Sequence, residues 1–411
     1  MRRVSAKAGC TAAALLLCWG CSPGEVRSGE SGHTDSGAGD PDAKPAADAA
    51  AENSPDSGRG DAGIGDDASP GHEAWFSYPA SSDDPDLALE EKVSELVASA
   101  VPGSQIRAAV YTWSRANMAE DFIAAHERGV DVRVVLGAEY NATETKKDAL
   151  PDGHVIVCRK GGEPAACHGD ATQGNKMFLF SELDDGSRDV VVQSSANLTR
   201  SQTVANNSLV VVRDDEALYA AFRSYWDDLA RNQYEPDYYR VAEGDSHTRA
   251  YFFPRGSGDG ITGEGDTVWE IFDAIDCSSG SVLHIGQARF RWNRRGLAHK
   301  LVQMRSEGCE IHAVLEPGRT DERIEEMLTD AGVSVTYFPR IHSKYFLLDG
   351  VYEEDESQWV WTGSQNFSGA GLIGNDNVIL QLANSALYEA FLEDWSILQS
   401  HPDAYVASPA R

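Results

Sequence analysis

Polar side chains suited to binding and transferring phosphate recur at fixed spacing between positions 342 and 366. His342 and Lys344 are two apart, Asp349 follows, and Ser364 and Asn366 are again two apart. Residues two apart in a strand point to one face, so we expect His342 and Lys344 to share a pocket. Lysine gives phosphate oxygens a point charge, and Ser and Asn add neutral donors. Histidine attacks phosphorus or protonates a leaving oxygen, so the stretch predicts phosphate chemistry.

An incomplete copy of this pattern lies 168 to 169 positions earlier. Its matching members are Lys176, Ser195 and Asn197. Gly174 stands at the position of the histidine, and Ser181 at that of the aspartate. Glycine can neither transfer a proton nor form a covalent phosphoryl adduct. The sequence therefore predicts a duplicated site with one damaged half.

The repetition extends beyond these side chains. Segments 217–222 and 386–391 match at a separation of 169, as do Asn206-Asn207 and Asn375-Asp376, whereas 122–136 and 301–315 match at 179. The first copy therefore carries about ten extra residues, in a region that contains Cys158, Cys167 and His168.

Each copy has the pattern of alternating helices and strands. In the first, we expect a helix over 89–100, a strand from 106, a helix ending near Gly129 and a buried strand over 130–136. In the second, the corresponding elements are expected at 268–275, 282–285, up to Gly308, and 311–315. This alternation predicts an α/β fold of two lobes related by a pseudo-twofold axis, with the site on that axis.

The N-terminal region has the features of an exported protein. Residues 1–20 combine a basic start with an apolar run too short to cross a bilayer, as in a signal peptide. Gly20-Cys21 resembles a bacterial lipidation site, with simple secretion as the alternative. Residues 21–72 are poor in large apolar side chains and are expected to be a disordered acidic tether. The first lobe is then expected over 73–240 and the second over 241–411.

Charge and cysteine content limit the function further. The chain carries a formal charge of −30, and −25 remains after removing +3 from Arg2, Arg3 and Lys7 and −8 from the tether. Such a charge disfavours nucleic acid as a partner but allows a small phosphodiester held by local cations. Four cysteines remain beyond the signal, and the short loop between Cys158 and Cys167 makes these two the best candidates for a disulfide. The spacing does not indicate a metal site.

His-x-Lys-x4-Asp followed by Gly-Ser-x-Asn resembles the signature of the phospholipase D superfamily, and the two-lobed duplication covers nearly all of 73–411. The resemblance implies metal-independent chemistry without a cofactor, in which one histidine attacks phosphorus and another protonates the leaving alcohol. It assigns catalysis to His342, Lys344, Asp349 and Lys176, and substrate contacts to Ser195, Asn197, Ser364 and Asn366. This chain departs from the pattern at Gly174, Ser181 and Ser194. A glutamate common in the family is also absent: Ser208 follows Asn206-Asn207, and Asn377 follows Asn375-Asp376.

Three interpretations of the missing histidine remain open. His168, in the extra loop, substitutes for it; or the protein binds a phosphate-bearing ligand without turning it over; or His342 alone supports slow or altered chemistry. The Arg289–Arg295 stretch is either a solvated loop or a contact for an anionic head group. Trp113, at the equivalent place in the first lobe, is expected in the core.

The leading functional hypothesis is an envelope phosphodiesterase that acts on phospholipid or another small phosphodiester. The alternative is a pseudoenzyme that binds a phosphate-bearing ligand at the cell envelope. A nuclease is disfavoured by the acidic charge.

Overall fold

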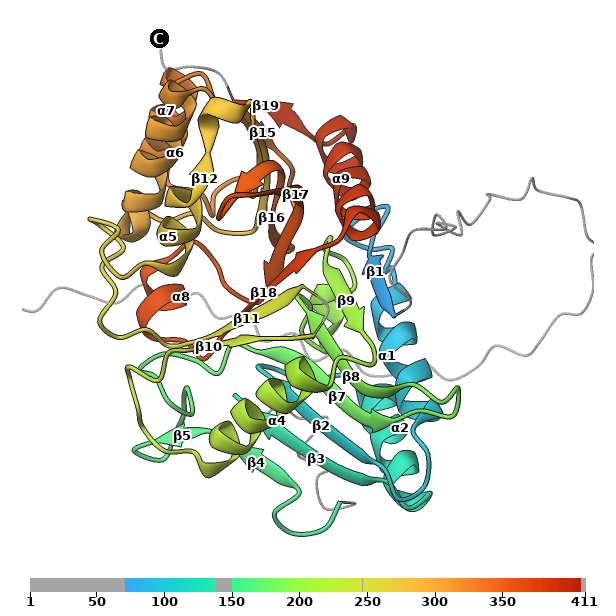
Figure 1. Cartoon of the computed structure of the whole chain (residues 1–411). Coiled ribbons are helices and arrows are strands. Elements are labelled where there is room, and N and C mark those ends of the chain that lie inside the picture. The colour runs from blue at the N-terminus through green and yellow to red at the C-terminus, as the bar shows by residue number, and fades with distance from the viewer. Residues whose placement is uncertain (1–70, 138–149, 246, 408–411) are drawn as a thin grey trace, which may run out of the picture. The chain divides into compact units, whose positions relative to one another are not determined.

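Two mixed β-sheets, one from each half of the chain, form the framework of the protein (Figure 1). The computed structural model describes residues 71–137, 150–245 and 247–407. The predicted signal peptide, Cys21 and the tether up to residue 70 lie outside these residues. The expected boundary between residues 72 and 73 falls inside the first strand, because His72 already pairs with Val212.

The first sheet contains seven of the described strands. In spatial order they are β1 (His72–Phe76), β9 (Ser208–Val212), β8 (Arg188–Ser194), β7 (Lys176–Glu182), β2 (Gln105–Val110), β3 (Asp131–Leu136) and β4 (Val155–Val157). The last three strands are parallel to one another and the other pairs are antiparallel. A separate small hairpin joins β5 (Arg159–Lys160) and β6 (Glu163–Pro164).

The second sheet repeats this arrangement. Its order is β10 (Arg240–Glu243), β11 (Thr248–Phe252), β18 (Val378–Ala383), β17 (Asp355–Gly363), β16 (Lys344–Tyr352), β13 (Val282–Gln287), β14 (Glu310–Leu315), β15 (Ser334–Tyr337) and β19 (Tyr405–Val406). A short strand, β12 (Ile275–Asp276), pairs with the end of β16. The series β9-β8-β7-β2-β3-β4 therefore corresponds to β18-β17-β16-β13-β14-β15, which confirms the predicted duplicated α/β fold.

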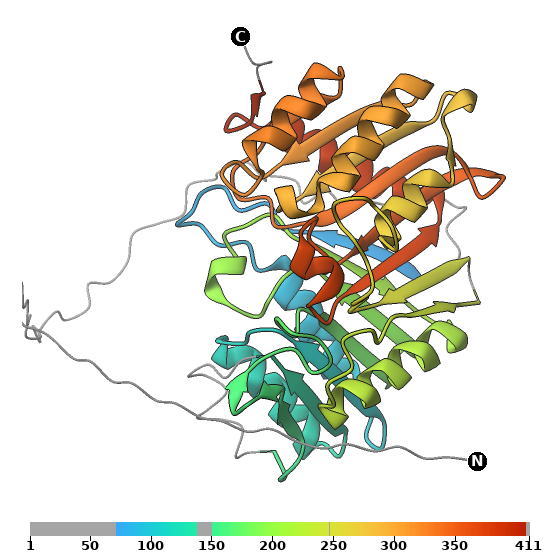
Figure 2. The ribbon, with the colours of Figure 1, turned by 90° about the vertical axis from the view of Figure 1, so that its left-hand side faces the viewer.

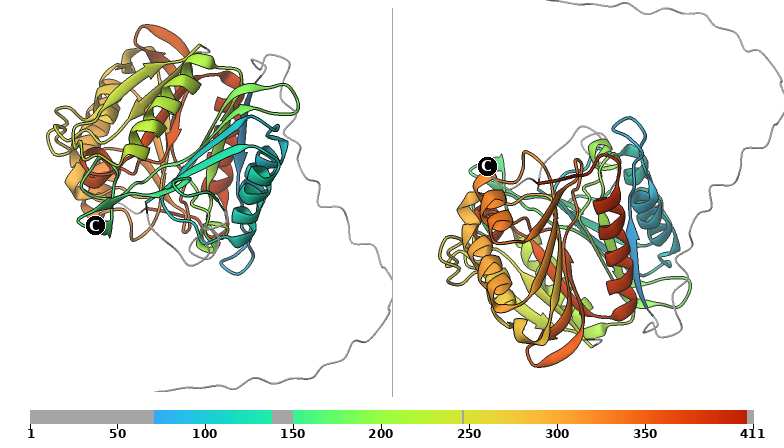
Figure 3. Two further views of the ribbon diagram at one scale, coloured as in Figure 1. Left: turned by 90° about the horizontal axis from the view of Figure 1, so that it is seen from below. Right: turned by 90° about the horizontal axis from the view of Figure 1, so that it is seen from above.

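Helices cover the outer face of each sheet. On the first sheet these are α1 (Ala88–Ser99) and α2 (Ala116–Glu127), and on the second they are α5 (Thr267–Asp273), α6 (Arg295–Glu307) and α7 (Glu322–Asp330). Figure 3 shows these two sets at opposite sides of the sheets. The elements predicted from the sequence agree closely, and Gly308 ends α6 in the left-handed conformation that favours glycine. Trp113 is buried in the first outer core, as expected.

The inner layer is built from both lobes. It contains α4 (Glu216–Arg231) and α9 (Ser385–Ser400), whose apolar residues join those of both sheets in one hydrophobic cluster. Each helix begins at a side-chain cap: Asp215 accepts from the Leu218 N–H, and Asn384 from the Leu387 N–H. Figure 2 shows α4 beside β10 and β11 of the second sheet. This shared core fixes the two half-sites relative to each other, because both sheets pack on it.

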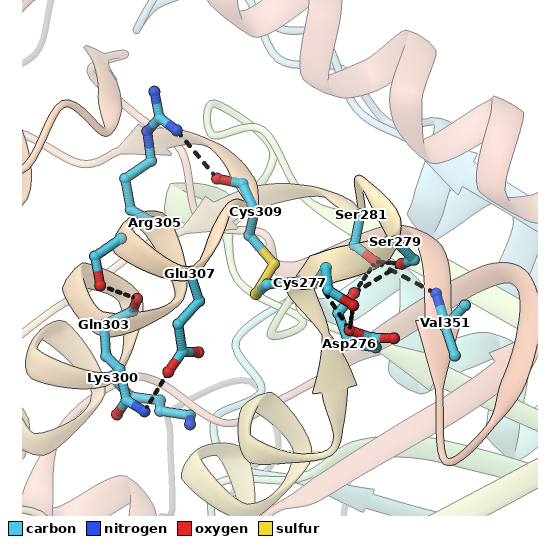
Figure 4. Close-up of a disulfide and its surroundings, with 12 residues drawn as sticks. Asp276, Cys277, Ser279, Ser281, Lys300, Gln303, Arg305, Glu307, Cys309 and Val351 are labelled. Carbon is cyan, nitrogen blue, oxygen red and sulfur yellow. Dashed lines mark hydrogen bonds between the residues drawn. A yellow bond between two sulfur atoms is a disulfide. The ribbon is translucent and has the colours of Figure 1, made fainter.

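Two disulfides link segments next to the sheets. Cys158 and Cys167 are bonded as predicted, and Cys277 is bonded to Cys309. Figure 4 shows the second bond, which links the segment after β12 to the end of α6. None of the described helices combines the length and apolar character needed to span a bilayer.

Candidate functional site

Two equivalent connections cross between the lobes where the phosphate motifs lie. The N–H of His342 donates to Asn206 O over 2.8 Å, and the N–H of Gly174 donates to Asp376 O over 2.8 Å. Because Gly174 corresponds to His342, Asn206 corresponds to Asp376. The sequence alignment of Asn206 with Asn375 was therefore wrong by one residue. The two half-sites meet across the pseudo-twofold axis.

His342 is held by a side chain of the other lobe. Its Nδ1 lies 2.9 Å from Oδ1 of Asn207. The Asn207 amide orientation is fixed, because Nδ2 donates to Gln202 O at 3.0 Å and to Ala205 O at 3.2 Å. Its Oδ1 also accepts from the Ser195 hydroxyl at 3.0 Å. Since an amide oxygen only accepts, Nδ1 of His342 must carry the proton, which leaves the lone pair on Nε2.

Two lysines lie beside this histidine. Lys344 and Lys176 are 4% and 5% exposed, and neither makes an ion pair within the described residues. Each ammonium donates to the carbonyl two residues earlier: Lys344 to His342 O, and Lys176 to Gly174 O at 2.6 Å. Buried cations without carboxylates are costly, so an anionic ligand would stabilise this arrangement.

Burial and mutual repulsion shift the pKa values of this cluster. Burial lowers the pKa of Lys176 to about 7. Burial, and then the charge of Lys176, holds the pKa of Lys344 well below its usual value. The pKa of His342 is lowered well below 6.5 by burial and by both lysines. His342 is therefore neutral at neutral pH, which is the form that can act as a nucleophile.

The other half of the site has the same support without the imidazole. Oδ1 of Asn377 accepts from the Ser364 hydroxyl at 3.1 Å, and its Nδ2 donates to Gly371 O at 3.2 Å. This repeats the Ser195 and Asn207 arrangement. A Cβ added to Gly174 would lie 2.4 Å from Oδ1 of Asn377. The acceptor that would orient a first-lobe histidine is therefore present, and it occupies part of that histidine's space.

The predicted substrate-binding residues separate into two kinds. Ser195 and Ser364 are buried and donate to Asn207 and Asn377, respectively, so they position other groups. Asn197 and Asn366 are only half-buried, and the Asn197 Oδ1 atom has no hydrogen-bond partner among the described residues. Asn197 and Asn366 therefore remain the better candidates for direct contact with a ligand.

Asp349 lies away from this cluster. It is five residues from Lys344 along β16, which is about 16 Å at the rise of a strand, and it points to the other face. Its side chain is exposed and accepts from Gln358 Nε2 at 3.4 Å. The position does not support the predicted catalytic role of Asp349. Lys344 and Asp349 are an odd number of residues apart in one strand, so their side chains point to opposite faces.

His168 is held in an aromatic environment. Its ring stacks on Tyr238 at a centroid distance of 4.2 Å, and its Nδ1 lies 3.0 Å from Gln233 O. Backbone N–H groups of this loop, including that of His168, donate to the buried carboxylate of Asp376. These partners are different from those of His342, so the placement does not support His168 as the substitute histidine.

The Arg289–Arg295 stretch has two distinct parts. Arg294 is fully buried and makes a bidentate ion pair with Asp266, at 2.8 and 2.7 Å. Arg289 is exposed, and its charge lowers the pKa of His342 and of Lys344 after burial and the nearer cations. The loop therefore combines a structural arginine with an exposed one whose charge acts on His342 and Lys344.

Sequence reasoning missed three further residues of the site. Asn207 was matched only as part of the repeat, and its role depends on contact between the lobes. Arg319 is exposed and acts on the His342 pKa in the same direction as Arg289. Glu316 follows β14, and burial raises its pKa to about 7 although the N–H groups of Arg340 and Ile341 bind it. No signal in the sequence marked Arg319 or Glu316.

Residues that typically bind metal ions do not cluster here. Within 71–137, 150–245 and 247–407, no group of three or more His, Cys, Asp or Glu side chains is arranged to hold a metal ion. The site is instead cationic, which suits a phosphate group directly.

Comparisons with known proteins agree with this architecture. Residues 94–230 and 271–396 match the family model described as cardiolipin synthase, PLD-like domain. None of the curated proteins is a significant match. The structure resembles phosphatidylserine synthase from Haemophilus influenzae Rd KW20, with 12% identity, a TM-score of 0.56, and coverage of 84% of this chain and 90% of that one. It also resembles polyphosphate kinase from Porphyromonas gingivalis, with 11% identity and a TM-score of 0.56. That match covers 83% of this chain but only 51% of the kinase.

At these identities the solved structures show a shared fold. The family match is broader evidence, because its two segments together cover more than half of the chain and fall one in each lobe. Together with the paired half-sites, it establishes that this chain belongs to the phospholipase D-like family.

Proposed function

We propose that the protein is a phosphodiesterase of the phospholipase D type that acts on phospholipid or a related phosphodiester. The observation that carries this proposal is the neutral His342, with its lone pair on Nε2 and two buried lysines beside it. Nε2 would attack phosphorus while the lysines neutralise the non-bridging oxygens. Oδ1 of Asn207 would hold the Nδ1 proton as positive charge develops on the ring.

Trapping the covalent intermediate tests this proposal. The purified chain would be mixed with phosphatidylcholine vesicles carrying a radiolabelled phosphate, quenched in base, and assayed for label bound to protein. We expect alkali-stable label on the native chain and on His299→Ala, which changes an exposed histidine of α6, and none on His342→Ala. Equal labelling of native and His342→Ala proteins would exclude His342 as the nucleophile.

A second candidate function is ligand binding without turnover. It is favoured by Gly174 and by the Asn377 side chain that occupies part of the missing histidine's space. Head-group release by native, His342→Ala and Gly174→His/Asn377→Ala chains separates the two candidates. If native and His342→Ala chains are equally inactive while the double variant gains activity, the protein is a phosphate-binding pseudoenzyme.

The exposed arginines provide a contact for an anionic head group. Arg289 and Arg319 both lower the pKa of His342 and make no ion pair with a carboxylate among the described residues. A phosphodiester bears one negative charge, so these extra cations favour a substrate with a second anionic group. The formal charge of −30 disfavours nucleic acid as that substrate.

We also propose that the protein is exported and anchored by a lipid on Cys21. The basic start, the apolar run and Gly20-Cys21 support this location. Membrane fractionation of native and Cys21→Ala chains tests it, with the native chain expected in the membrane fraction and the variant in the soluble one.

A further inference from the structure

The leaving group of the proposed reaction departs on the side of the damaged half-site. In a phosphoryl transfer the attacking and leaving atoms lie roughly in line through phosphorus. His342 attacks from the second lobe, and Gly174 is its pseudo-twofold counterpart in the first. The leaving oxygen therefore moves toward the first-lobe half-site, where Gly174 stands in place of the histidine that would protonate it.

Lys176 has its ionisable group at this place. Its ammonium donates to Gly174 O over 2.6 Å, and the side chain is 5% exposed. Its charge lowers the pKa of both His342 and Lys344, as expected for a cation close to that pair. Lys344 is on the nucleophile's side, because its Nζ lies 3.2 Å from Nδ1 and 3.5 Å from Nε2 of His342.

Three other ionisable groups are held by partners of their own. The Asp376 carboxylate, whose backbone carbonyl binds the Gly174 N–H, accepts from the N–H groups of Cys167, His168 and Gly169. His168 is stacked on Tyr238 and bound at Nδ1 to Gln233 O. The Glu316 carboxyl is bound by the N–H groups of Arg340 and Ile341, which directly precede His342, so it lies on the nucleophile's side.

We propose that Lys176 is a general acid and base of this site, protonating the leaving oxygen in place of the missing histidine. This inference rests on the proposed function, and it gives Lys176 a role beyond neutralising phosphate.

The proposed cycle balances with water as its only co-reactant. Nε2 of His342 forms a bond to phosphorus, the phosphorus–oxygen bond breaks, and the leaving oxygen takes its electron pair and a proton from the Lys176 ammonium. The neutral Lys176 amine then accepts a proton from the attacking water. The water oxygen bonds to phosphorus, the phosphorus–nitrogen bond breaks with its electron pair returning to Nε2, and a phosphomonoester is released.

The ionisation of Lys176 suits both steps. Burial lowers its pKa to about 7, so near neutral pH it can lose a proton and regain it. An acid–base catalyst works best when its pKa is near the operating pH. A lysine with the usual pKa of about 10.4 would give up its proton much less readily.

Substrates with different leaving groups test this role. Phosphatidylcholine releases choline, whose departing alkoxide needs a proton, whereas phosphatidyl-p-nitrophenol releases a stabilised phenolate that does not. Both would be presented in the same vesicles to native and Lys176→Arg chains. The arginine keeps the positive charge but does not release a proton. We expect Lys176→Arg to lose about 10²-fold or more in kcat on phosphatidylcholine and less than about tenfold on the phenyl ester.

The native chain gives a second measurement that needs no variant. Above pH of about 7, kcat/KM for phosphatidylcholine should fall relative to kcat/KM for the phenyl ester, because only the former needs protonated Lys176 for its leaving group. Equal slowing of both substrates in Lys176→Arg, together with a pH-independent ratio in the native chain, overturns the inference and leaves the proposed function in place. Inactivity of the native chain toward both substrates, and also toward vesicles of phosphatidylserine, which carries a second anionic group, overturns both.

Discussion

Nδ1 of His342 lies 2.9 Å from Oδ1 of Asn207, although the two residues belong to different lobes. The contact fixes which ring nitrogen carries the proton and so leaves Nε2 available for attack. Because Asn207 is neutral, it orients the ring without favouring the imidazolium, and the low pKa of His342 is preserved.

Replacing Asn207 should change both the rate and its pH dependence. In Asn207→Ala the ring loses its acceptor, and we expect kcat to fall about 10- to 100-fold, as for other orienting partners. In Asn207→Asp the new carboxylate raises the pKa of His342, so the acidic limb of kcat/KM moves to higher pH. Profiles of kcat/KM against pH check this, and an unmoved acidic limb in Asn207→Asp would contradict the assigned contact.

Arg289 and Arg319 should affect substrates according to their charge. In Arg289→Gln and Arg319→Gln we expect KM for phosphatidylserine to rise about tenfold, the size of one charged hydrogen bond. KM for the zwitterionic phosphatidylcholine and kcat for both lipids should change little. Initial rates at low and high salt check this, since added salt should weaken the effect by screening. An equal rise of KM for both lipids would contradict selectivity for an anionic head group.

His168 should be dispensable for the chemistry. His168→Phe keeps an aromatic ring on Tyr238 and removes only the Nδ1 contact with Gln233 O. We expect kcat to change by less than about tenfold, whereas loss of a general acid or base typically costs about 10² to 10⁴. Head-group release by native and His168→Phe chains measures this. A loss as large as that of His342→Ala would restore His168 as the substitute histidine.

The buried ion pair between Arg294 and Asp266 should be important for stability. Arg294→Met leaves the fully buried Asp266 carboxylate uncompensated, so we expect the free energy of unfolding to fall by about 3 to 5 kcal/mol. Urea denaturation followed by circular dichroism measures the loss. The matched control is Arg291→Gln, an exposed neighbour that should change stability by less than about 0.5 kcal/mol. Similar losses in both variants would argue against a special role of the buried pair.

Local patterns in the sequence determined much of the fold. Apolar spacing predicted α1, β2, α2 and β3 and their second-lobe counterparts, because helix and strand periodicities depend on neighbouring residues. The repeat predicted two similar lobes, and the short loop between Cys158 and Cys167 predicted that disulfide. The same reasoning identified His342, Lys344 and Lys176. It also showed that Gly174 can neither transfer a proton nor form a covalent phosphoryl adduct.

Only the tertiary structure decided which groups meet. The contact of His342 with Asn207, and the one-residue correction of the repeat, depend on how two sheets pack on a shared inner layer. Spacing along the chain did not indicate that Arg289 is exposed while Arg294 is fully buried. The physical reason is that periodicity assigns a side chain to a face of its own element, whereas its partners depend on the packing of elements distant in sequence.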